Sequence, residues 1–142
     1  MRIYVATGFD NIARGREVIA AFRASGHAIT FDWPATGPQG QSGESLQQAA
    51  ENELAGVRNA DVVVALLPGG RGTHAEIGMA LAFDKPTVIV AETNTFPVDN
   101  TTCCFYHHPN VLRMVYKLDT AERAASFVMM VETFWRGFNH AD

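Results

Sequence analysis

The chain has 142 residues, a formal net charge of -4 at pH 7, 47% hydrophobic residues and 18% charged residues. This is the length of one ordinary domain with its own core, so we expect a single domain over residues 1–142. The slightly acidic balance excludes the basic surface that nucleic-acid binding requires, and no nucleic-acid partner is expected. The opening "MRIYVATG" has one charge and a short apolar run, which indicates neither a signal peptide nor a membrane span. We therefore expect a cytoplasmic protein without membrane contacts.

Short apolar segments predict five strands, at 3–6, 28–31, 62–67 and 87–91 and, more weakly, at 113–118. The third and fourth segments, "VVVALL" and "TVIVA", are continuous rather than alternating, as expected for strands covered on both faces of a parallel sheet. Between and after the strands, apolar residues recur at helical spacing and predict helices. The expected buried faces contain Ile12, Ile19 and Phe22, then Leu46, Ala50, Leu54 and Val57, then Ile77, Ala80 and Leu81, and finally Phe127, Val131 and Phe134.

Strands and helices alternate along the whole chain, which predicts an α/β fold: a three-layer, Rossmann-like sandwich with a five-stranded parallel sheet. In such sheets ligands bind at the carboxyl ends of the strands. The glycine-rich, aromatic and polar loops all follow strands and therefore fall on that one rim: "TGFD" at 7–10, "DWPATGPQGQSG" at 32–43, "PGGRG" at 68–72 and the long loop at 92–110.

The stretch "LPGGRGTHAEIG" at 67–78 places Glu76 just behind a glycine loop, at the expected start of a helix. One interpretation is structural, because Thr73 followed three residues later by a glutamate matches the capping-box pattern. The other is functional: a backbone bare of side chains lets a ligand approach closely, and the free N–H groups of a helix start favour an anion.

Two further residues are candidates for the same rim. Glu53 lies five or six residues before the end of its helix, so it can lean toward the carboxyl ends of the strands, although a solvated outer glutamate fits the spacing equally well. Tyr4 lies in a strand expected beside the one that feeds the glycine loop, and a buried tyrosine hydroxyl needs a polar partner. Asp32 and Trp33 end a strand on this rim and either contact the sugar and base or belong to a loop packed on its own tryptophan.

The segments "RIYVATGF", "NELAGVRNADVVVALL" and "GRGTHAEIGMALAFDKPTVIV" together resemble the nucleoside 2-deoxyribosyltransferase family. The resemblance runs in order from residue 2 to about residue 91 and extends to residue 118. It implies a flavodoxin-like sandwich, in agreement with the strand and helix pattern.

The resemblance also implies roles for individual residues. Glu76 matches the family's nucleophile, and Glu53 matches the acid that serves the departing base, a position that is usually aspartate in the family. Tyr4 matches the tyrosine that hydrogen-bonds the nucleophile, whereas Asp61 starts a strand and is read as structural. The first loop supplies Thr7, Gly8 and Phe9 to the substrate site, with Phe9 as the aromatic wall for the base.

In relatives that act on nucleotides, the turn before the nucleophile holds the 5'-phosphate. By position this turn corresponds here to Gly70, Arg71, Gly72 and Thr73, with Arg71 as the natural anion partner. We expect His74, at the pocket mouth, to form hydrogen bonds. Family members are dimers or larger, so we expect a homodimer or larger homo-oligomer in which the stretch at 100–102, beginning with Asn100, closes a neighbouring pocket.

These assignments predict an enzyme that cleaves or transfers the N-glycosidic bond of a nucleoside or its 5'-monophosphate through a glycosyl-glutamate intermediate. The sugar, the base and the choice between hydrolysis and transfer stay open. The letters "PGGRGTHAE" also resemble the motif of cytokinin-activating phosphoribohydrolases, and a non-catalytic nucleotide sensor is a further alternative. No cofactor is expected. We expect no metal site, since the histidines lack clustered partners, and we expect Cys103 and Cys104 to be reduced.

Overall fold

The computed structural model describes residues 1–36 and 42–140, so part of the loop at 32–43 lies outside the described residues. Its sheet is entirely parallel, with the strand order β2-β1-β3-β4-β5. The strands are β1 (Arg2–Ala6), β2 (Ala28–Ile29), β3 (Val62–Leu66), β4 (Thr87–Ala91) and β5 (Val111–Val115). The predicted α/β fold with a five-stranded parallel sheet is confirmed.

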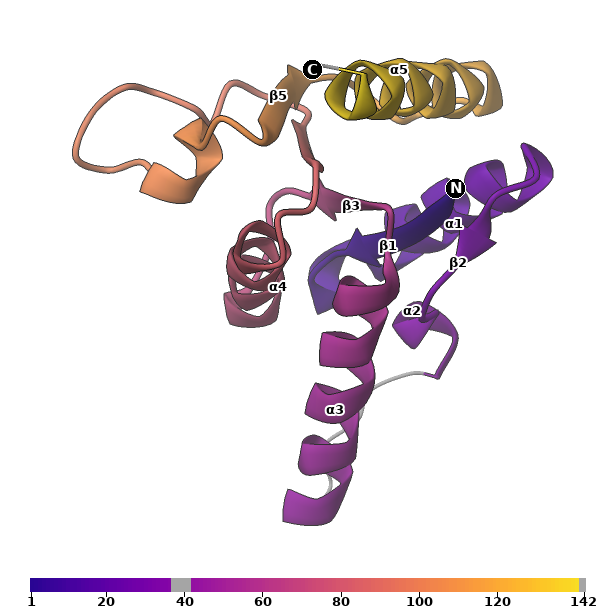
Figure 1. Ribbon diagram of the computed structural model, residues 1–142, viewed down its shortest axis with the longest axis vertical. Coiled ribbons are helices and arrows are strands. Elements are labelled where there is room, and N and C mark those ends of the chain that lie inside the picture. The colour runs from indigo at the N-terminus through magenta and orange to yellow at the C-terminus, as the bar shows by residue number, and fades with distance from the viewer. Residues whose placement is uncertain (37–41, 141–142) are drawn as a thin grey trace.

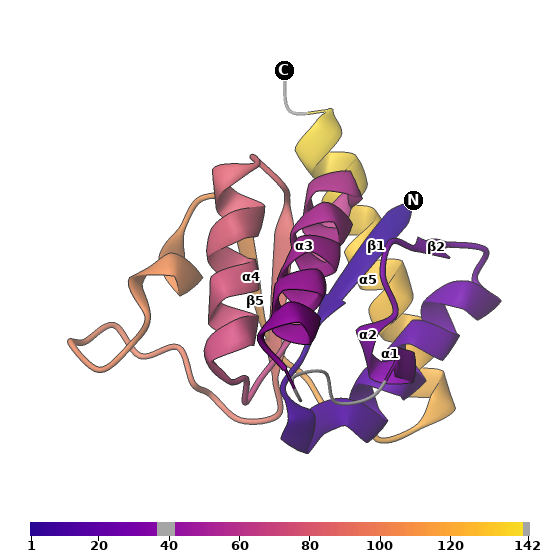
Figure 2. The same cartoon turned by 90° about the horizontal axis from the view of Figure 1, so that it is seen from below.

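Helices cover both faces of the sheet and make the three layers (Figure 1). One face carries α1 (Ile12–Ala24) and α5 (Ala121–Asn139), and the other carries α3 (Gly43–Asn59) and α4 (Arg71–Ala82), which stand in front of the strands in Figure 2. Three short helices lie in the connections: η1 (Phe9–Asn11), α2 (Trp33–Thr36) and η2 (Cys104–His107). None of the helices in residues 1–36 and 42–140 is long and apolar enough to cross a membrane.

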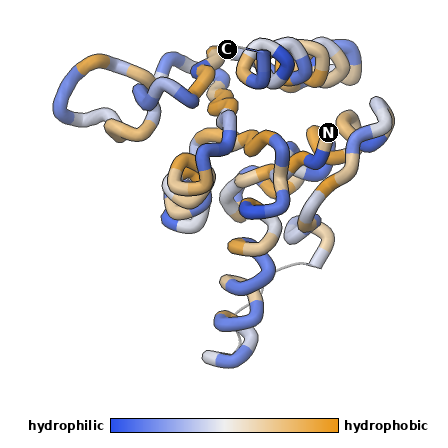
Figure 3. The backbone as a smooth tube through the Cα atoms, viewed as in Figure 1, coloured by the Kyte–Doolittle hydropathy of each residue, from blue (hydrophilic) through white to orange (hydrophobic). Residues whose placement is uncertain are grey.

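Strand β1 serves both faces because successive side chains of a strand point to opposite sides. Ile3 and Val5 join the apolar cluster under α1 and α5, whereas Tyr4 and Ala6 join the cluster under α3 and α4. The central strands are accordingly the most hydrophobic part of the backbone trace, while much of α3 is hydrophilic (Figure 3). A polar side chain on the second face, such as the Tyr4 hydroxyl, therefore lies between the sheet and its two helices.

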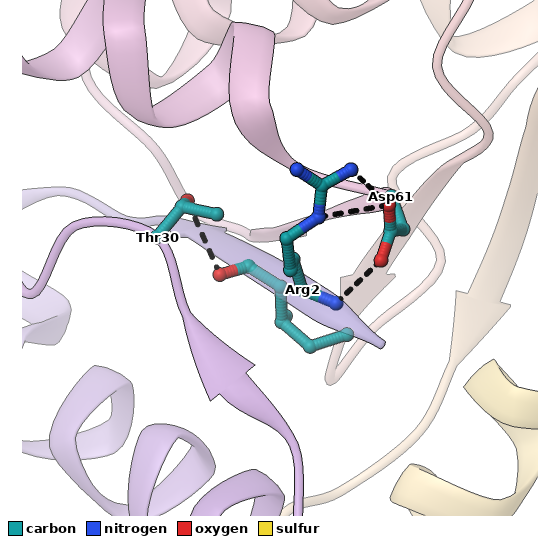
Figure 4. A network of polar contacts seen from close by, with 4 residues as sticks. Arg2, Thr30 and Asp61 are labelled. Atoms are coloured by element: carbon teal, nitrogen blue, oxygen red, sulfur yellow. Dashed lines mark hydrogen bonds and ion pairs between the residues drawn. The ribbon is translucent and has the colours of Figure 1, made fainter.

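The amino-terminal end of the sheet is fixed by polar contacts (Figure 4). The Asp61 carboxylate accepts the backbone N–H of Arg2 at 2.7 Å and the guanidinium Nη2 at 2.7 Å. On the other side of β1, the Thr30 N–H and hydroxyl both donate to the carbonyl oxygen of Ile3. Asp61 thus ties the start of β1 to the start of β3, the structural role expected for it, and lies at the end of the sheet opposite the predicted ligand rim.

Two strands differ in length from the predictions. Strand β2 is an edge strand of two residues rather than four, pairing only with Arg2 and Ile3 before the chain turns away. Strand β5 begins two residues before the predicted 113–118 segment and ends at Val115, because β4, its one neighbour, pairs only from Thr87 to Ala91.

The predicted apolar face of α3 is wrong in its first half. Leu46 is 55% exposed and Ala50 is also exposed, whereas Val57 is fully buried. A helix of 17 residues is about 25 Å long, against about 17 Å for a strand of five residues. The helix is therefore buried only near its C-terminal end, and its first half projects from the body of the molecule (Figure 1).

Candidate active site

The loops after β1 and β3 meet at the carboxyl ends of these adjacent strands. Ala6 pairs with Ala65 at the last step of the ladder, and each chain then turns into a glycine-containing loop. A Cβ atom added to Gly8 would lie 3.2 Å from the backbone nitrogen of Gly70. The two loops are thus in direct backbone contact, which places Gly8 and Gly70 together as predicted for neighbouring strands.

Directly beneath these loops, the Tyr4 hydroxyl donates a hydrogen bond to Glu76 Oε1. Tyr4 comes from β1 and Glu76 from α4, and both side chains are almost completely buried. Burying a carboxyl group costs free energy of folding. A buried carboxyl bonded to one tyrosine therefore does not serve to stabilise the apolar core. The contact is the one that the family resemblance implies for this pair.

Glu53 is the second carboxyl group near this pair. It lies on α3 and is half-buried, so it leans inward rather than standing on the solvated face. Burial is the main cause of the raised pKa of Glu76 and Tyr4, and the charge of Glu53 adds to both increases.

Burial strongly shifts the protonation of this group of residues. Removal from water raises the pKa of Glu76 to about 8, with a further increase from the charge of Glu53, while the Tyr4 hydrogen bond favours the anion and opposes the change. Burial also raises the pKa of Glu53. Perturbed carboxyl groups of this kind cluster at catalytic sites, where one must act as an acid and another as a base or nucleophile.

Gly56, one turn after Glu53, lets α3 approach the site closely. A Cβ atom at this position would lie 2.7 Å from Tyr4 Cε2 and 2.9 Å from the Cβ of Phe31. Any side chain here would displace the tyrosine ring or the helix. Sequence reasoning missed Gly56, although an isolated glycine inside a helical pattern is a signal for close packing.

The capping box expected from Thr73 and Glu76 does not form. Helix α4 begins at Arg71 with Gly70 as its N-cap, so Thr73 lies inside the first turn. The Thr73 hydroxyl is buried without a hydrogen-bond partner among residues 1–36 and 42–140, and a Cβ atom on Gly69 would lie 2.9 Å from it. The structural interpretation does not hold, because the helix starts earlier than the box requires, and Glu76 is bonded to Tyr4 instead.

The start of α4 consequently offers free donors. Within residues 1–36 and 42–140, no backbone N–H from Gly69 to Thr73 donates to a protein acceptor, and no side chain caps the helix. Arg71, the first helical residue, is exposed and forms no ion pair in the part of the chain that the structure describes. Free N–H groups at a helix start, with a cation beside them, form a binding site for a phosphate or carboxylate.

His74 joins this loop to the long connection after β4. Its Nδ1 lies 2.8 Å from the Gly70 carbonyl oxygen and its Nε2 lies 2.6 Å from the Tyr106 hydroxyl. Because a carbonyl can only accept, the Nδ1–H donates to Gly70 and Nε2 accepts from Tyr106. His74 is therefore a hydrogen-bonding side chain, as predicted, and Tyr106 is a partner that the sequence did not indicate.

The predicted aromatic wall stands at the edge of the rim. Phe9 is 63% exposed and packs edge-to-face on Trp33, with ring centroids 5.5 Å apart, while Trp33 itself is buried. The Asp32 carboxylate binds Arg23 at 2.8 Å and accepts the N–H of Ala35 at 3.2 Å. These partners favour the structural interpretation of Asp32, leaving Phe9 as the side chain of this region that is free to contact a ligand.

Thr7 and Asn100 are two further residues that were predicted for the site. Thr7 is buried, and its methyl group lies 2.8 Å from a Cβ added to Gly15, so it packs against α1. Asn100 is exposed in the connection after β4, which extends away from the body of the molecule (Figures 1 and 2). Cys103 and Cys104 are free thiols, as predicted. No metal-binding cluster of three or more His, Cys, Asp or Glu occurs in residues 1–36 and 42–140.

Comparison with known proteins gives the same fold. The structure is similar to that of the CMP N-glycosidase BcmB from Clostridium botulinum, with a TM-score of 0.62 and 17% identity over 93% of this chain and 99% of that one. It is also similar to a 2-deoxyribosyltransferase from Bacillus psychrosaccharolyticus, with a TM-score of 0.55 and 20% identity over 71% and 78% of the two chains. No curated protein sequence matches at a significant level.

The sequence itself matches the family model of the nucleoside 2-deoxyribosyltransferases over residues 3–139, which is almost its whole length. The match includes β1, α3 and α4, the elements that carry Tyr4, Glu53 and Glu76. The chain therefore belongs to the nucleoside 2-deoxyribosyltransferase family, a family of enzymes that transfer or cleave the N-glycosidic bond of nucleosides or nucleotides.

Proposed function

We propose that the chain acts on a nucleoside 5'-monophosphate and breaks its N-glycosidic bond through a covalent intermediate on Glu76. The observation that carries this proposal is the buried Tyr4–Glu76 pair directly behind an uncapped glycine loop. The loop supplies donors for the phosphate, and the pair supplies a carboxylate for the sugar. The exposed Arg71 beside these donors favours the monophosphate over the uncharged nucleoside.

In the first step, a carboxylate oxygen of Glu76 attacks the anomeric carbon of the sugar. The bond from that carbon to the base nitrogen breaks, its electron pair goes to the base, and Glu53 delivers a proton to the departing base. Burial shifts the pKa of Glu53 upward, the direction that favours the protonated form used in this step. The products of this step are the free base and a glycosyl ester of Glu76.

In the second step, water or another base attacks the same carbon, and the ester bond to Glu76 breaks. Glu53, now ionised, accepts the proton of the attacking group, so the enzyme returns to its starting state. Water gives hydrolysis and a second base gives transfer. The Tyr4 hydroxyl stabilises the Glu76 carboxylate both before attack and after its release, because its hydrogen bond favours the charged form.

We also propose that Asn100 acts on the site of a neighbouring copy in a homodimer or larger assembly. Asn100 is exposed on the connection after β4, which extends from the body of the molecule (Figures 1 and 2). Mixing inactive Glu76→Gln protein with an inactive Asn100→Ala variant should restore activity if the two residues work in one shared site. A monomeric protein in solution, or no restoration after subunit exchange, would contradict this part of the proposal.

The test is a chromatographic assay for free base. Purified protein is incubated with matched pairs of ribonucleosides, deoxyribonucleosides and their 5'-monophosphates, with and without a second base, alongside the Glu76→Gln variant. Release or exchange of base from monophosphates, lost in the variant, is the expected result. Binding without turnover in both proteins would instead identify a nucleotide sensor and contradict the proposal.

A further inference from the structure

Two side chains from the start of α1 hold the loop that leads into α4. Asn11 Nδ2 donates to the carbonyl oxygen of Pro68 at 2.7 Å, and Arg14 Nη1 donates to the carbonyl oxygen of Leu67 at 3.1 Å. The Arg14 side chain is only 12% exposed, and its nearest carboxylate, Glu92, is 3.9 Å away. Both side chains therefore direct their donors to the backbone immediately before the glycines.

The contact from Asn11 fixes the direction of a donor on the other side of the loop. In a trans peptide the C=O and N–H groups point in opposite directions, so a Pro68 carbonyl held toward Asn11 turns the Gly69 N–H away from it. Asn11 leads into α1, which covers the face of the sheet opposite to α4 (Figure 2). The Gly69 N–H is thereby directed toward the side that carries Glu76, and it has no acceptor within the described chain.

The carbonyl group of Gly70, two residues after Pro68, is held in a similar way. His74 holds the Gly70 carbonyl oxygen, which fixes the direction of the Arg71 N–H in the same way. Asn11 and His74 therefore approach the loop from opposite ends, and each leaves an unpaired N–H on the peptide that it holds. With the Leu67, Pro68 and Gly70 carbonyl groups held, the loop presents N–H donors, and this is what recognition of an anion requires.

We propose that Asn11 and Arg14 are positioning residues that preset this loop for the 5'-phosphate and so determine the preference for a monophosphate over a nucleoside. The inference rests on the proposed function, since it concerns the phosphate of that substrate. Neither residue has to contact the sugar or the base. Their loss should therefore weaken phosphate recognition while sparing the bond-breaking step.

The test compares Asn11→Ala and Asn11→Asp with wild type and with a matched control, Asn139→Ala. Asn139 makes the same kind of bond, from Nδ2 to the Trp135 carbonyl oxygen at 2.8 Å, at the far end of α5. For each protein, kcat and KM are measured with a nucleoside and its 5'-monophosphate, and the Kd of inorganic phosphate is measured by calorimetry. Thermal unfolding confirms that each variant is folded.

We expect Asn11→Ala to raise both the KM of the monophosphate and the Kd of inorganic phosphate about tenfold, the value of one ordinary hydrogen bond. The kcat values and the nucleoside KM should stay within about twofold of wild type. Asn11→Asp should raise the monophosphate KM and the phosphate Kd further, because it places a carboxylate against a carbonyl oxygen and near the anion. Arg14→Lys keeps the charge and should still weaken phosphate binding if the guanidinium acts by positioning.

Equal losses for nucleoside and monophosphate, or an unchanged phosphate Kd in both Asn11 variants, would overturn the inference and leave the proposed function intact. If wild type binds phosphate without cleaving any substrate, the proposed function fails, and a weaker phosphate Kd in Asn11→Ala would still support the positioning role. A wild-type protein that does not bind phosphate would overturn the inference even if it cleaves nucleosides.

Discussion

The two faces of the sheet are built from the same strands but in different ways. Under α1 and α5 the buried side chains form an apolar cluster that includes the large rings of Phe22 and Phe127. Under α3 and α4 the same strand β1 turns Tyr4 inward, and a carboxyl group is buried against it. Successive side chains of β1 point to opposite faces of the sheet. One face therefore carries apolar packing that stabilises the fold, and the other carries the Tyr4–Glu76 pair.

This difference between the faces explains how a small domain can contain a site that lowers its folding stability. Burying the carboxyl of Glu76 with a single strong partner opposes folding, because the charged form loses its hydration. The apolar face offsets this cost, since each large buried side chain contributes roughly 1.5–3 kcal/mol. Substitutions on the two faces should therefore have opposite effects on stability and activity.

Replacing the nucleophile should have the largest effect on activity. We expect Glu76→Gln to reduce kcat/KM by about 10⁴-fold or more, as is typical when a covalent nucleophile is removed. The initial rate of base release at substrate concentrations below KM measures the change. A variant that retains turnover within about tenfold would show that Glu76 is structural.

The same variant should be more stable than wild type at alkaline pH. The pKa of Glu76 is raised from an ordinary value of 4.5 to about 8 in the folded protein, so wild-type stability is fully present below pH 4.5 and is lost as the pH rises through 8. Chemical unfolding at pH 5 and pH 9 should show a gain for Glu76→Gln at pH 9 only, on the order of a few kcal/mol. A pH-independent difference would contradict the raised pKa.

Tyr4→Phe should have the next largest effect. The Tyr4 hydrogen bond lowers the pKa of Glu76, so its removal should raise that pKa further and change the pH profile of kcat/KM. We expect about a tenfold to hundredfold loss of kcat/KM at pH 7 from less ionised nucleophile and weaker positioning. Since phenylalanine keeps the ring, an unchanged pH profile would mean that Tyr4 is ordinary core.

A methyl group at Gly56 should have a smaller effect through the same pair. Gly56→Ala brings a Cβ to within 2.7 Å of the Tyr4 ring, so the ring or α3 must shift. We expect kcat to fall about tenfold, because small misplacements at a reacting centre are expensive. Gly137→Ala is the matched control: its Cβ meets nothing within 4 Å, and it should raise stability by roughly 0.5–1 kcal/mol with unchanged kcat. Equal activity of the two variants would contradict the close fit at Gly56.

On the apolar face, Phe127→Leu should change activity least. Phe127 packs on Phe22 and Tyr116 and is fully buried. We expect a loss of about 1–3 kcal/mol of unfolding free energy with kcat unchanged at temperatures where the protein is folded. A loss of kcat comparable to that of Tyr4→Phe would erase the functional difference between the two faces.

The fold could be predicted because apolar runs and helical spacing are local signals. Val62–Leu66 and Thr87–Ala91 are continuous apolar strands in the middle of the sheet, and their sequences alone indicate burial on both faces. Helical spacing of apolar residues gives a wrong prediction of burial where a helix extends beyond the elements packed against it. Leu46 and Ala50 have helical spacing, but within the described part of the chain they are exposed, since the first half of α3 projects from the sheet.

Tyr4, Glu53 and Glu76 could be proposed for one site because each lies on an element whose place in the fold was predictable. The residues that hold the loops could not be found in this way. Asn11 and Pro68 are 57 positions apart, and His74 and Tyr106 are 32 apart. Such contacts depend on how two irregular segments meet, and periodicity carries no information about that.

The most direct test of the central claim is to look for the glycosyl ester on Glu76. The enzyme is mixed in excess with a nucleoside 5'-monophosphate that it cleaves, quenched in acid within the first turnover, and digested for mass spectrometry. We predict that the peptide containing Glu76 gains the mass of one sugar phosphate less one water, in proportion to the base released, and that the Glu76→Gln protein shows neither product. Base release in the first turnover without a modified Glu76, undiminished in Glu76→Gln, would contradict the account.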